Sequence, residues 1–347
     1  MLPTAFERMS RLLEDFVQLE SQDRRVAGIL FFGSFVKGKV RATSDLDLLV
    51  LHRDIDEYSR TRQIKNGTYF EVHRWPLATF ARPFSGRSGG AFQDAFCFEV
   101  MRNGRILYDP EGVLQRFRIY AQTHRLPLSH AEWFVQRAQR NLRLADSLLK
   151  AAELEGAELE LRKAAEELAR AVLLENDVLE LIPPKNLVPS LRDKASGFYG
   201  TFRAVHNIEK IDVEDVEVAI HEVSHWVDRT AEEIRCQGRQ DLLKLGSTVH
   251  GSRTELLNAR DCLENGDIEA AVLEVRYSAM LLASFIVTMI QGSGSGSQSR
   301  TQSDRYVLLA RSSHPFAETL KAIMNFSRDK TKLRKHIDAL EDAAGSH

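Results

Sequence analysis

The stretch that decides the fold of the first third of the chain is GILFFGSFVKGKVRATSDLDLLVL, residues 28–51. An apolar run of strand length ends at Gly33 and Ser34, ten residues intervene, and a second apolar run opens with Asp45 and Asp47. Residues i and i+2 of a strand point to the same face of a sheet, so we expect the two aspartates to project side by side. The spacing therefore predicts two adjacent carboxylates at the start of a buried strand.

Two neighbouring carboxylates on an apolar strand repel each other, and removing them from water is costly unless a cation lies between them. Mg²⁺ meets this need, because it takes oxygen ligands at about 2.0–2.1 Å and uses one or two carboxylates together with phosphates. Gly33 allows the backbone to approach a phosphate closely. The Ser34 hydroxyl and the N–H groups of a helix predicted to begin there would form an anion site. The pattern favours a metal ion together with a nucleoside triphosphate.

The surrounding sequence predicts an α/β mixture at the N-terminus. Apolar residues at helical spacing occupy 6–19, and short runs rich in Val, Ile, Phe and Tyr at 26–32, 46–51 and 68–75 predict strands. After about Pro127 the spacing of apolar residues changes, and long segments have a period of 3.6 residues. These predict helices over 130–153, 157–181, 213–235, 267–291 and parts of 314–342.

These two hydrophobic patterns predict an α+β fold, in which an N-terminal mixed sheet with flanking helices is followed by an all-α helical bundle. We place one domain at 1–125 and the helical domain at 126–291. A Gly/Ser-rich linker, native or engineered, spans 292–303, and a C-terminal helical segment follows at 304–347. Asp267 is the expected N-cap of an apolar, central helix.

Composition excludes several classes of protein. The chain has 347 residues, with 47 Lys+Arg against 49 Asp+Glu and 43% hydrophobic residues, as in packed globular proteins. The formal net charge of -2 gives no global attraction to nucleic acid or to anionic membranes. Three widely spaced cysteines indicate a reducing compartment. With no secretory signal and no run of about 18 apolar residues, we expect a cytoplasmic protein without membrane contact.

The residues quoted above resemble the signature of the polymerase-beta-like nucleotidyltransferase superfamily. That signature is a Gly-Ser turn, a gap of about ten residues, and Asp-x-Asp on the next strand. Here it is Gly33-Ser34 and Asp45-Leu46-Asp47, with Ser44 before the first aspartate as in minimal and kanamycin-nucleotidyltransferase-like enzymes. The resemblance covers roughly residues 15–120, and the helical remainder is similar in style to the helical domains that accompany these transferases.

The resemblance implies a transferase of the EC 2.7.7 type with two Mg²⁺ ions, held by Asp45, Asp47 and a third carboxylate on a later strand. Glu71, in the segment TYFEVHRW, is our candidate for that ligand and for assisting deprotonation of the acceptor, with His73 on the same face as the nearby alternative. The acceptor hydroxyl would attack the α-phosphorus of ATP or another nucleoside triphosphate, and pyrophosphate would leave. Two metal ions about 3.5–4 Å apart stabilise such attacking and leaving oxygens.

Five residues are candidates for binding the nucleotide: Gly33, Ser34, Lys37, Lys39 and Ser44. Ser34 would position the β- and γ-phosphates. The two lysines either neutralise phosphate charge or are solvated surface side chains.

The acceptor is a more open question than the donor. We expect AMP transfer to a small molecule such as an aminoglycoside, bound between the N-terminal domain and the helices, because a helical domain of this size can form a closed pocket. The alternative is transfer to tRNA or to a protein hydroxyl, as in toxin–antitoxin systems. A third class is a binding module without turnover, and exposed apolar helix surface would suit a homodimer.

A competing motif lies in the second half of the chain. His221-Glu222-Val223-Ser224-His225 places two imidazoles four residues apart on one predicted helix face, the spacing of zinc metallopeptidases with Glu as general base. No third ligand is marked by the sequence, and no sheet is predicted beside this helix. We therefore favour histidines that pack, form hydrogen bonds or line the acceptor pocket.

Overall fold

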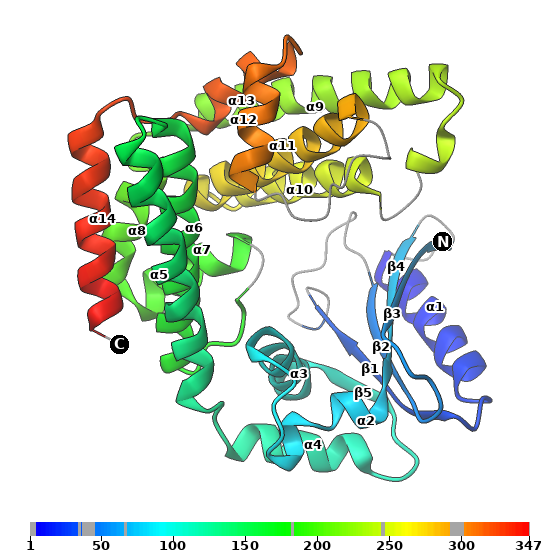
Figure 1. The fold of residues 1–347 in the computed structure, drawn as a ribbon. Coiled ribbons are helices and arrows are strands. Elements are labelled where there is room, and N and C mark those ends of the chain that lie inside the picture. The colour runs from blue at the N-terminus through cyan, green and yellow to red at the C-terminus, as the bar shows by residue number, and fades with distance from the viewer. Residues whose placement is uncertain are drawn as a thin grey trace. The chain divides into compact units, whose positions relative to one another are not determined.

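The structure is a computed structural model, and it describes residues 5–33, 36, 46–65, 68–181, 184–243, 247–291 and 302–346. The chain divides into two compact units, Met1–Pro127 and Leu128–His347. The first contains a sheet with helices and the second contains helices (Figure 1). The predicted α+β class, with a mixed sheet followed by a helical region, is confirmed.

The N-terminal unit contains a mixed five-stranded sheet in the order β3-β4-β2-β1-β5 within the described residues. Strand β2 is parallel to β4, whereas the pairs β1/β2, β1/β5 and β3/β4 are antiparallel. The strands are β1 Val26–Phe32, β2 Leu46–His52, β3 Ser59–Lys65, β4 Thr68–Pro76 and β5 Arg105–Tyr108; the helices are α1 Ala5–Glu20, α2 Leu77–Phe80, the 3₁₀ turn η1 Pro83–Ser85, α3 Ala91–Asn103 and α4 Val113–Thr123.

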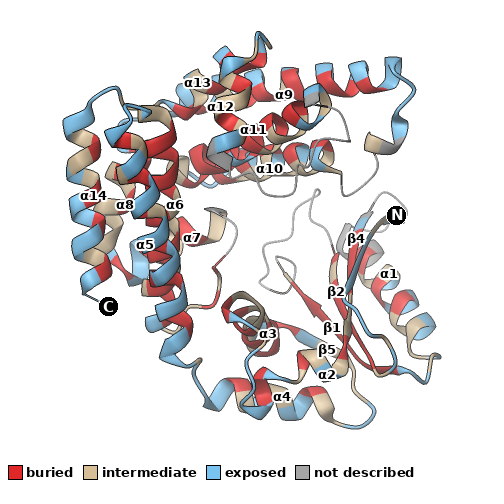
Figure 2. Cartoon of the chain, viewed as in Figure 1, coloured by how far each residue is buried: buried red, intermediate tan, exposed pale blue. Residues whose placement is uncertain are grey.

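Alternation along the strands separates the two faces of this sheet. Helix α1 packs Leu13 and Phe16 against Ile29 of β1 and Leu48 of β2. Residues of the opposite parity face α3 and α4, where Phe96 of α3 contacts the rings of Phe32, His73 and Trp75. The central strands are buried on both faces, and all seven residues of β1 are buried (Figure 2). The sheet is thus a rigid base for polar side chains that emerge on the α3 face.

The second unit contains helices only among its described residues. They are α5 Leu128–Lys150, α6 Leu154–Glu175, α7 Pro184–Lys194, α8 Ser196–His206, α9 Val213–Cys236, the 3₁₀ turn η2 Gln240–Leu243, α10 Thr248–Glu264, α11 Ile268–Gln291, α12 Gln302–Arg311, α13 Phe316–Met324 and α14 Lys330–Gly345. Helices α5 and α6 form an extensive pair, to which α14 adds. Helix α11 is central, with contacts to α7, α9, α10, α12 and α13.

Helix α11 begins where the sequence predicts. The backbone N–H of Ala270 donates to Oδ1 of Asp267 at 3.2 Å, which confirms the expected N-cap. An apolar span, Ile268–Ile290, is long enough to cross a membrane and has a mean hydropathy of 1.6, yet 78% of its most apolar window is buried inside the unit. Its burial is that of a core helix.

Two predicted boundaries, the end of one helix and the end of the linker, can be compared with the structure. The helix expected to continue to Leu181 ends at Glu175, and Asp177 adopts a left-handed backbone with φ 59°. Of the expected linker, residues 292–301 lie outside the described residues, and α12 already begins at Gln302. Helices α12–α14 belong to the same compact unit as α5–α11.

Candidate active site

Gly33 follows β1 directly and has a left-handed backbone with φ 83°. A Cβ atom at this position would clash with the carboxylate of Asp47, which would have to turn away. The left-handed backbone favours glycine, and any side chain here would displace the Asp47 carboxylate. The turn after β1 lies directly against a carboxylate of the neighbouring strand.

Asp47 is placed by the register of three strands. It pairs with Phe32 across the antiparallel β1/β2 ladder and with Glu71 across the parallel β2/β4 ladder. Residues in register on adjacent strands project from the same face, so the two carboxylates emerge together on the α3 side of the sheet. Asp47 is half-buried, whereas the Glu71 side chain is only 7% exposed.

Glu71 is surrounded by donors. Nε of Arg62 donates to its Oε2 at 2.7 Å, Nε2 of His73 lies 2.8 Å from its Oε1, and Arg60 forms a second ion pair with Oε1. Burial alone would raise the pKa of Glu71, but the bonds from His73, Arg60 and Arg62 outweigh it and hold that pKa well below its usual range. Glu71 is therefore a carboxylate at any pH at which the protein works.

His73 is oriented by a tyrosine. The Tyr58 hydroxyl lies 2.8 Å from Nδ1 of His73, and burial raises the pKa of Tyr58, so its O–H group stays available as a donor. With Nδ1 as the acceptor, the Nε2–H group of His73 donates to Glu71. This tautomer follows from the partners, and it makes His73 a group that positions Glu71.

The donor set fits a divalent cation. Asp47, Glu71 and His73 each offer a ligand atom, and these atoms lie within 4.8 Å of one another. Asp47 and Glu71 supply the carboxylate oxygens that Mg²⁺ prefers, while the Nε2 atom of His73 is occupied by its bond to Glu71. Each carboxylate oxygen has two lone pairs, so Glu71 can accept a metal ion when one arginine withdraws.

The predicted site residues divide into two groups. Gly33, Asp47 and Glu71 come together on the inner strands β1, β2 and β4. The remaining candidates lie outside the described residues: Ser34, Lys37, Lys39, Ser44 and Asp45.

The prediction missed Arg60, Arg62 and Tyr58. The only available signal was the alternation of the two arginines in SRTRQIK, residues 59–65, just before the strand that carries Glu71. A strand with this alternation presents both arginines to one face.

The His-Glu-x-x-His motif lies in α9, with both histidines exposed. Across the described part of the chain, no third His, Cys, Asp or Glu joins His221 and His225 in a group able to hold a metal ion. Glu222 lines a cavity of the helical unit instead. The zinc-peptidase alternative therefore gains no support from the structure.

Comparison with known proteins bears on the N-terminal unit. Residues 9–80 match the family model of the nucleotidyltransferase domain, and this range contains Gly33, Asp47 and Glu71. A similar solved structure is a nucleotidyltransferase-like protein from Exiguobacterium sibiricum, with a TM-score of 0.39 and 11% sequence identity over 82% of this chain and 80% of that one. No curated protein matches the chain. The family match confirms the resemblance: residues 9–80 form a nucleotidyltransferase domain, which implies a nucleoside triphosphate substrate.

Proposed function

We propose that the nucleotidyltransferase domain of residues 9–80 transfers a nucleoside monophosphate, AMP from ATP in the first instance, to an acceptor hydroxyl. The observation that carries the proposal is the meeting of Gly33, Asp47 and Glu71 on neighbouring inner strands, within the matched range. In the reaction, the acceptor oxygen forms a bond to the α-phosphorus. The bond from that phosphorus to the bridging oxygen breaks, pyrophosphate carries away the electron pair, and the acceptor proton passes to water.

Asp47 and Glu71, together with Asp45, would hold Mg²⁺, two ions in our proposal. Bound there, the metal would neutralise phosphate charge and polarise the reacting oxygens. Gly33 keeps the turn after β1 close to Asp47 and free of a side chain, which leaves room for a phosphate. Ser34, Lys37, Lys39 and Ser44 remain our candidates for contacts to the triphosphate.

Glu71 serves better as a ligand than as a base. A carboxylate whose pKa lies well below its usual range is a weak proton acceptor. The part of Glu71 in deprotonating the acceptor stays a prediction. Tyr58 and His73 hold the Glu71 carboxylate in place. An arginine that released Glu71 to a metal ion, Arg60 or Arg62, would become a cationic donor for the triphosphate.

We further propose a small-molecule acceptor and a cytoplasmic location. The net charge of -2 suits a cationic acceptor such as an aminoglycoside weakly. Cys97, Cys236 and Cys262 are free thiols, as expected in a reducing compartment.

The test is transfer of label from α-labelled ATP with Mg²⁺ into the small-molecule, RNA and protein fractions of a cell extract, with an aminoglycoside panel alongside. Asp47→Asn should abolish the transfer, while Asp56→Asn, a change at an exposed residue outside the site, should leave it intact. The fraction that carries the label names the acceptor class. Equal labelling by wild type and Asp47→Asn would contradict the proposal, as would no labelling with any of the four nucleotides.

A further inference from the structure

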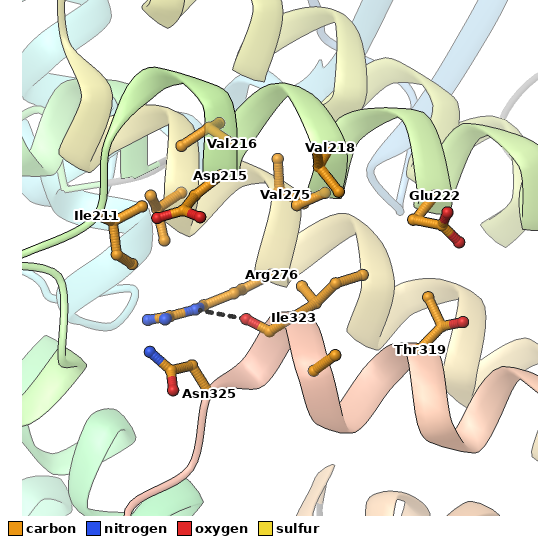
Figure 3. A pocket seen from close by; sticks show the side chains of 13 residues that line it. Ile211, Asp215, Val216, Val218, Glu222, Val275, Arg276, Thr319, Ile323 and Asn325 are labelled. Carbon is orange, nitrogen blue, oxygen red and sulfur yellow. Dashed lines mark hydrogen bonds between the residues drawn. The ribbon is translucent and has the colours of Figure 1, made fainter.

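The helical unit contains a cavity of 420 Å³ between α9, α11 and the end of α13. This volume lies within the range of roughly 300–1,000 Å³ that small-molecule sites occupy. Its walls are largely apolar and include Val216, Val218 and Ala219 of α9, Val272 and Val275 of α11, and Ile323 of α13 (Figure 3). Such walls suit the hydrocarbon or aromatic body of a ligand.

A buried cation lies at one end of this cavity. Arg276 is only 4% exposed and extends beside Asn325 at the end that Ile211 also borders (Figure 3). Its Nε donates to the carbonyl of Ile323 at 3.2 Å and its Nη1 donates to the carbonyl of His206, but its buried Nη2 has no hydrogen-bond partner. A buried donor without a partner costs about 1–3 kcal/mol, more for a charged group.

The charge on Arg276 is not balanced by a carboxylate. Among the described residues no Asp or Glu lies within ion-pair distance of it, and burial and the neighbouring Arg162 lower the pKa of the Arg276 guanidinium. Arg162 is also 4% exposed and is paired with Glu158, while its Nε and Nη1 have no partners. Glu158 therefore forms its ion pair with Arg162 and not with Arg276.

Two carboxylates along the cavity limit which ligands it can bind. Asp215 and Glu222 are exposed and line it from α9, and Oδ2 of Asp215 accepts a hydrogen bond from the backbone N–H of Asp212. These two carboxylates, Asp215 at the end of Arg276 and Glu222 at the other end (Figure 3), disfavour a ligand with several negative charges. A single negative charge is sufficient to balance Arg276.

We infer that this cavity binds a small carboxylic acid with an apolar body, its carboxylate directed to Arg276 and Asn325 and its body against the Val and Ile walls. The carboxylate would give the guanidinium of Arg276 an ion-pair partner, which no described residue supplies. The apolar body would supply hydrophobic burial of about 25 cal/mol per Å². The inference is independent of the proposed transferase activity, because it concerns binding to the helical unit alone.

The test measures binding of 3-phenylpropanoate and hexanoate to the full chain by isothermal titration calorimetry, each beside its neutral amide. We expect the acids to bind and the amides to bind at least about tenfold more weakly, since the amides lack the charge. Amides that bind as tightly as the acids would overturn the inference. So would the absence of saturable binding of either acid, which would mean that the cavity holds water only.

Three variants locate the binding. Arg276 is left in place because it satisfies two backbone carbonyls. Asn325→Asp supplies an internal carboxylate next to Arg276, and aspartate tolerates the left-handed backbone found there, φ 47°. Ala219→Phe fills the apolar part of the cavity. Both should weaken acid binding at least about tenfold without unfolding the chain, whereas Ala339→Phe, at an exposed position of α14, should not. Unchanged binding by folded Asn325→Asp and Ala219→Phe would also overturn the inference.

Discussion

At the scale of single residues, the close contact between Gly33 and Asp47 is the most sensitive feature of the site. We expect Gly33→Ala to destabilise the N-terminal unit by about 1–3 kcal/mol and to abolish nucleotidyl transfer, because the new Cβ must displace the Asp47 carboxylate. Thermal unfolding and the transfer assay measure the two effects.

Gly86 provides the matched control. It has a similar left-handed backbone, φ 73°, but a Cβ there would meet nothing within 4 Å. Gly86→Ala should therefore show a comparable loss of stability with transfer retained. If the two variants lose transfer equally, the contact with Asp47 is not what the reaction requires.

Glu71 links the site to the pH dependence of stability. Its pKa in the folded state lies below its usual value, so its partners stabilise the protein above that usual value, and the contribution is lost as the pH falls toward the folded-state pKa. We expect Glu71→Gln to lower the free energy of unfolding by about 1–3 kcal/mol at neutral pH and to flatten the decline toward acid. Urea unfolding across pH 3–7 checks this, and Glu57→Gln at an exposed position should reproduce the wild-type slope.

The sequence predicts Gly33 and Asp47 from their spacing and Glu71 from the family resemblance, and the structure brings these three residues together. It could not identify Tyr58, Arg60 and Arg62, since their role depends on which strand pairs with β4. That pairing is a long-range choice, and nothing in a polar segment such as SRTRQIK specifies it.

At the scale of secondary-structure elements, β3 controls access to Glu71. We expect Arg62→Gln to reduce the Mg²⁺ concentration for half-maximal transfer by about tenfold, because this arginine competes with the metal for the same oxygen. A Mg²⁺ titration of the transfer rate measures the change.

Arg74 offers a control on the other face of the sheet, where it pairs with Glu20 of α1. Arg74→Gln should leave the Mg²⁺ dependence unchanged. The contrary result would be an Arg62→Gln variant with a higher KM for ATP but the same Mg²⁺ requirement as the wild type. That result would assign Arg62 to binding of the triphosphate alone.

Elements that are strongly periodic or continuously apolar were predictable, including β1, β2, β4, α5, α9 and α11. Strands β3 and β5 were not, because β3 is polar and lies at the edge of the sheet and β5 has only four residues. Edge strands are solvated on one side and need no apolar alternation. Their existence is decided by the partner strand.

At the scale of the whole molecule, one buried glutamate in each unit responds to pH, and the two respond with opposite sign. In the helical unit, burial and then the nearby Glu255 raise the pKa of Glu274 well above its usual value, and Glu274 is fully buried. A raised pKa contributes stability below the usual value of a glutamate, and that contribution is lost as the pH rises through the folded-state pKa. This sign is the reverse of that for Glu71.

We therefore expect Glu274→Gln to stabilise the chain by about 1–3 kcal/mol near pH 8 and to have little effect near pH 4. The amide can still accept the bond that Oε1 receives from the backbone N–H of Lys185 at 2.8 Å. Thermal unfolding at both pH values is the measurement, with Glu264→Gln at an exposed position as the control. Destabilisation by Glu274→Gln at pH 8 would mean that the ionised carboxylate is required.

The division of the chain was predictable in outline only. A change from short apolar runs to long helical periodicity marks the passage to the second unit. The inclusion of α12–α14 in that unit was not predictable, because it depends on which helices pack against α11. The sequence shows only that α11 is apolar enough to be buried by other helices.

The position of α11 has a consequence for synthesis of the chain on the ribosome. Helix α11 emerges after α9 and α10, but α12 and α13, which cover another part of its surface, are translated only after ten further residues, 292–301. During that interval a span with the hydropathy of a membrane helix lacks part of its cover. A nascent chain paused at this point would expose part of this apolar surface, so we expect the speed of translation through residues 292–301 to affect how much protein reaches the native state.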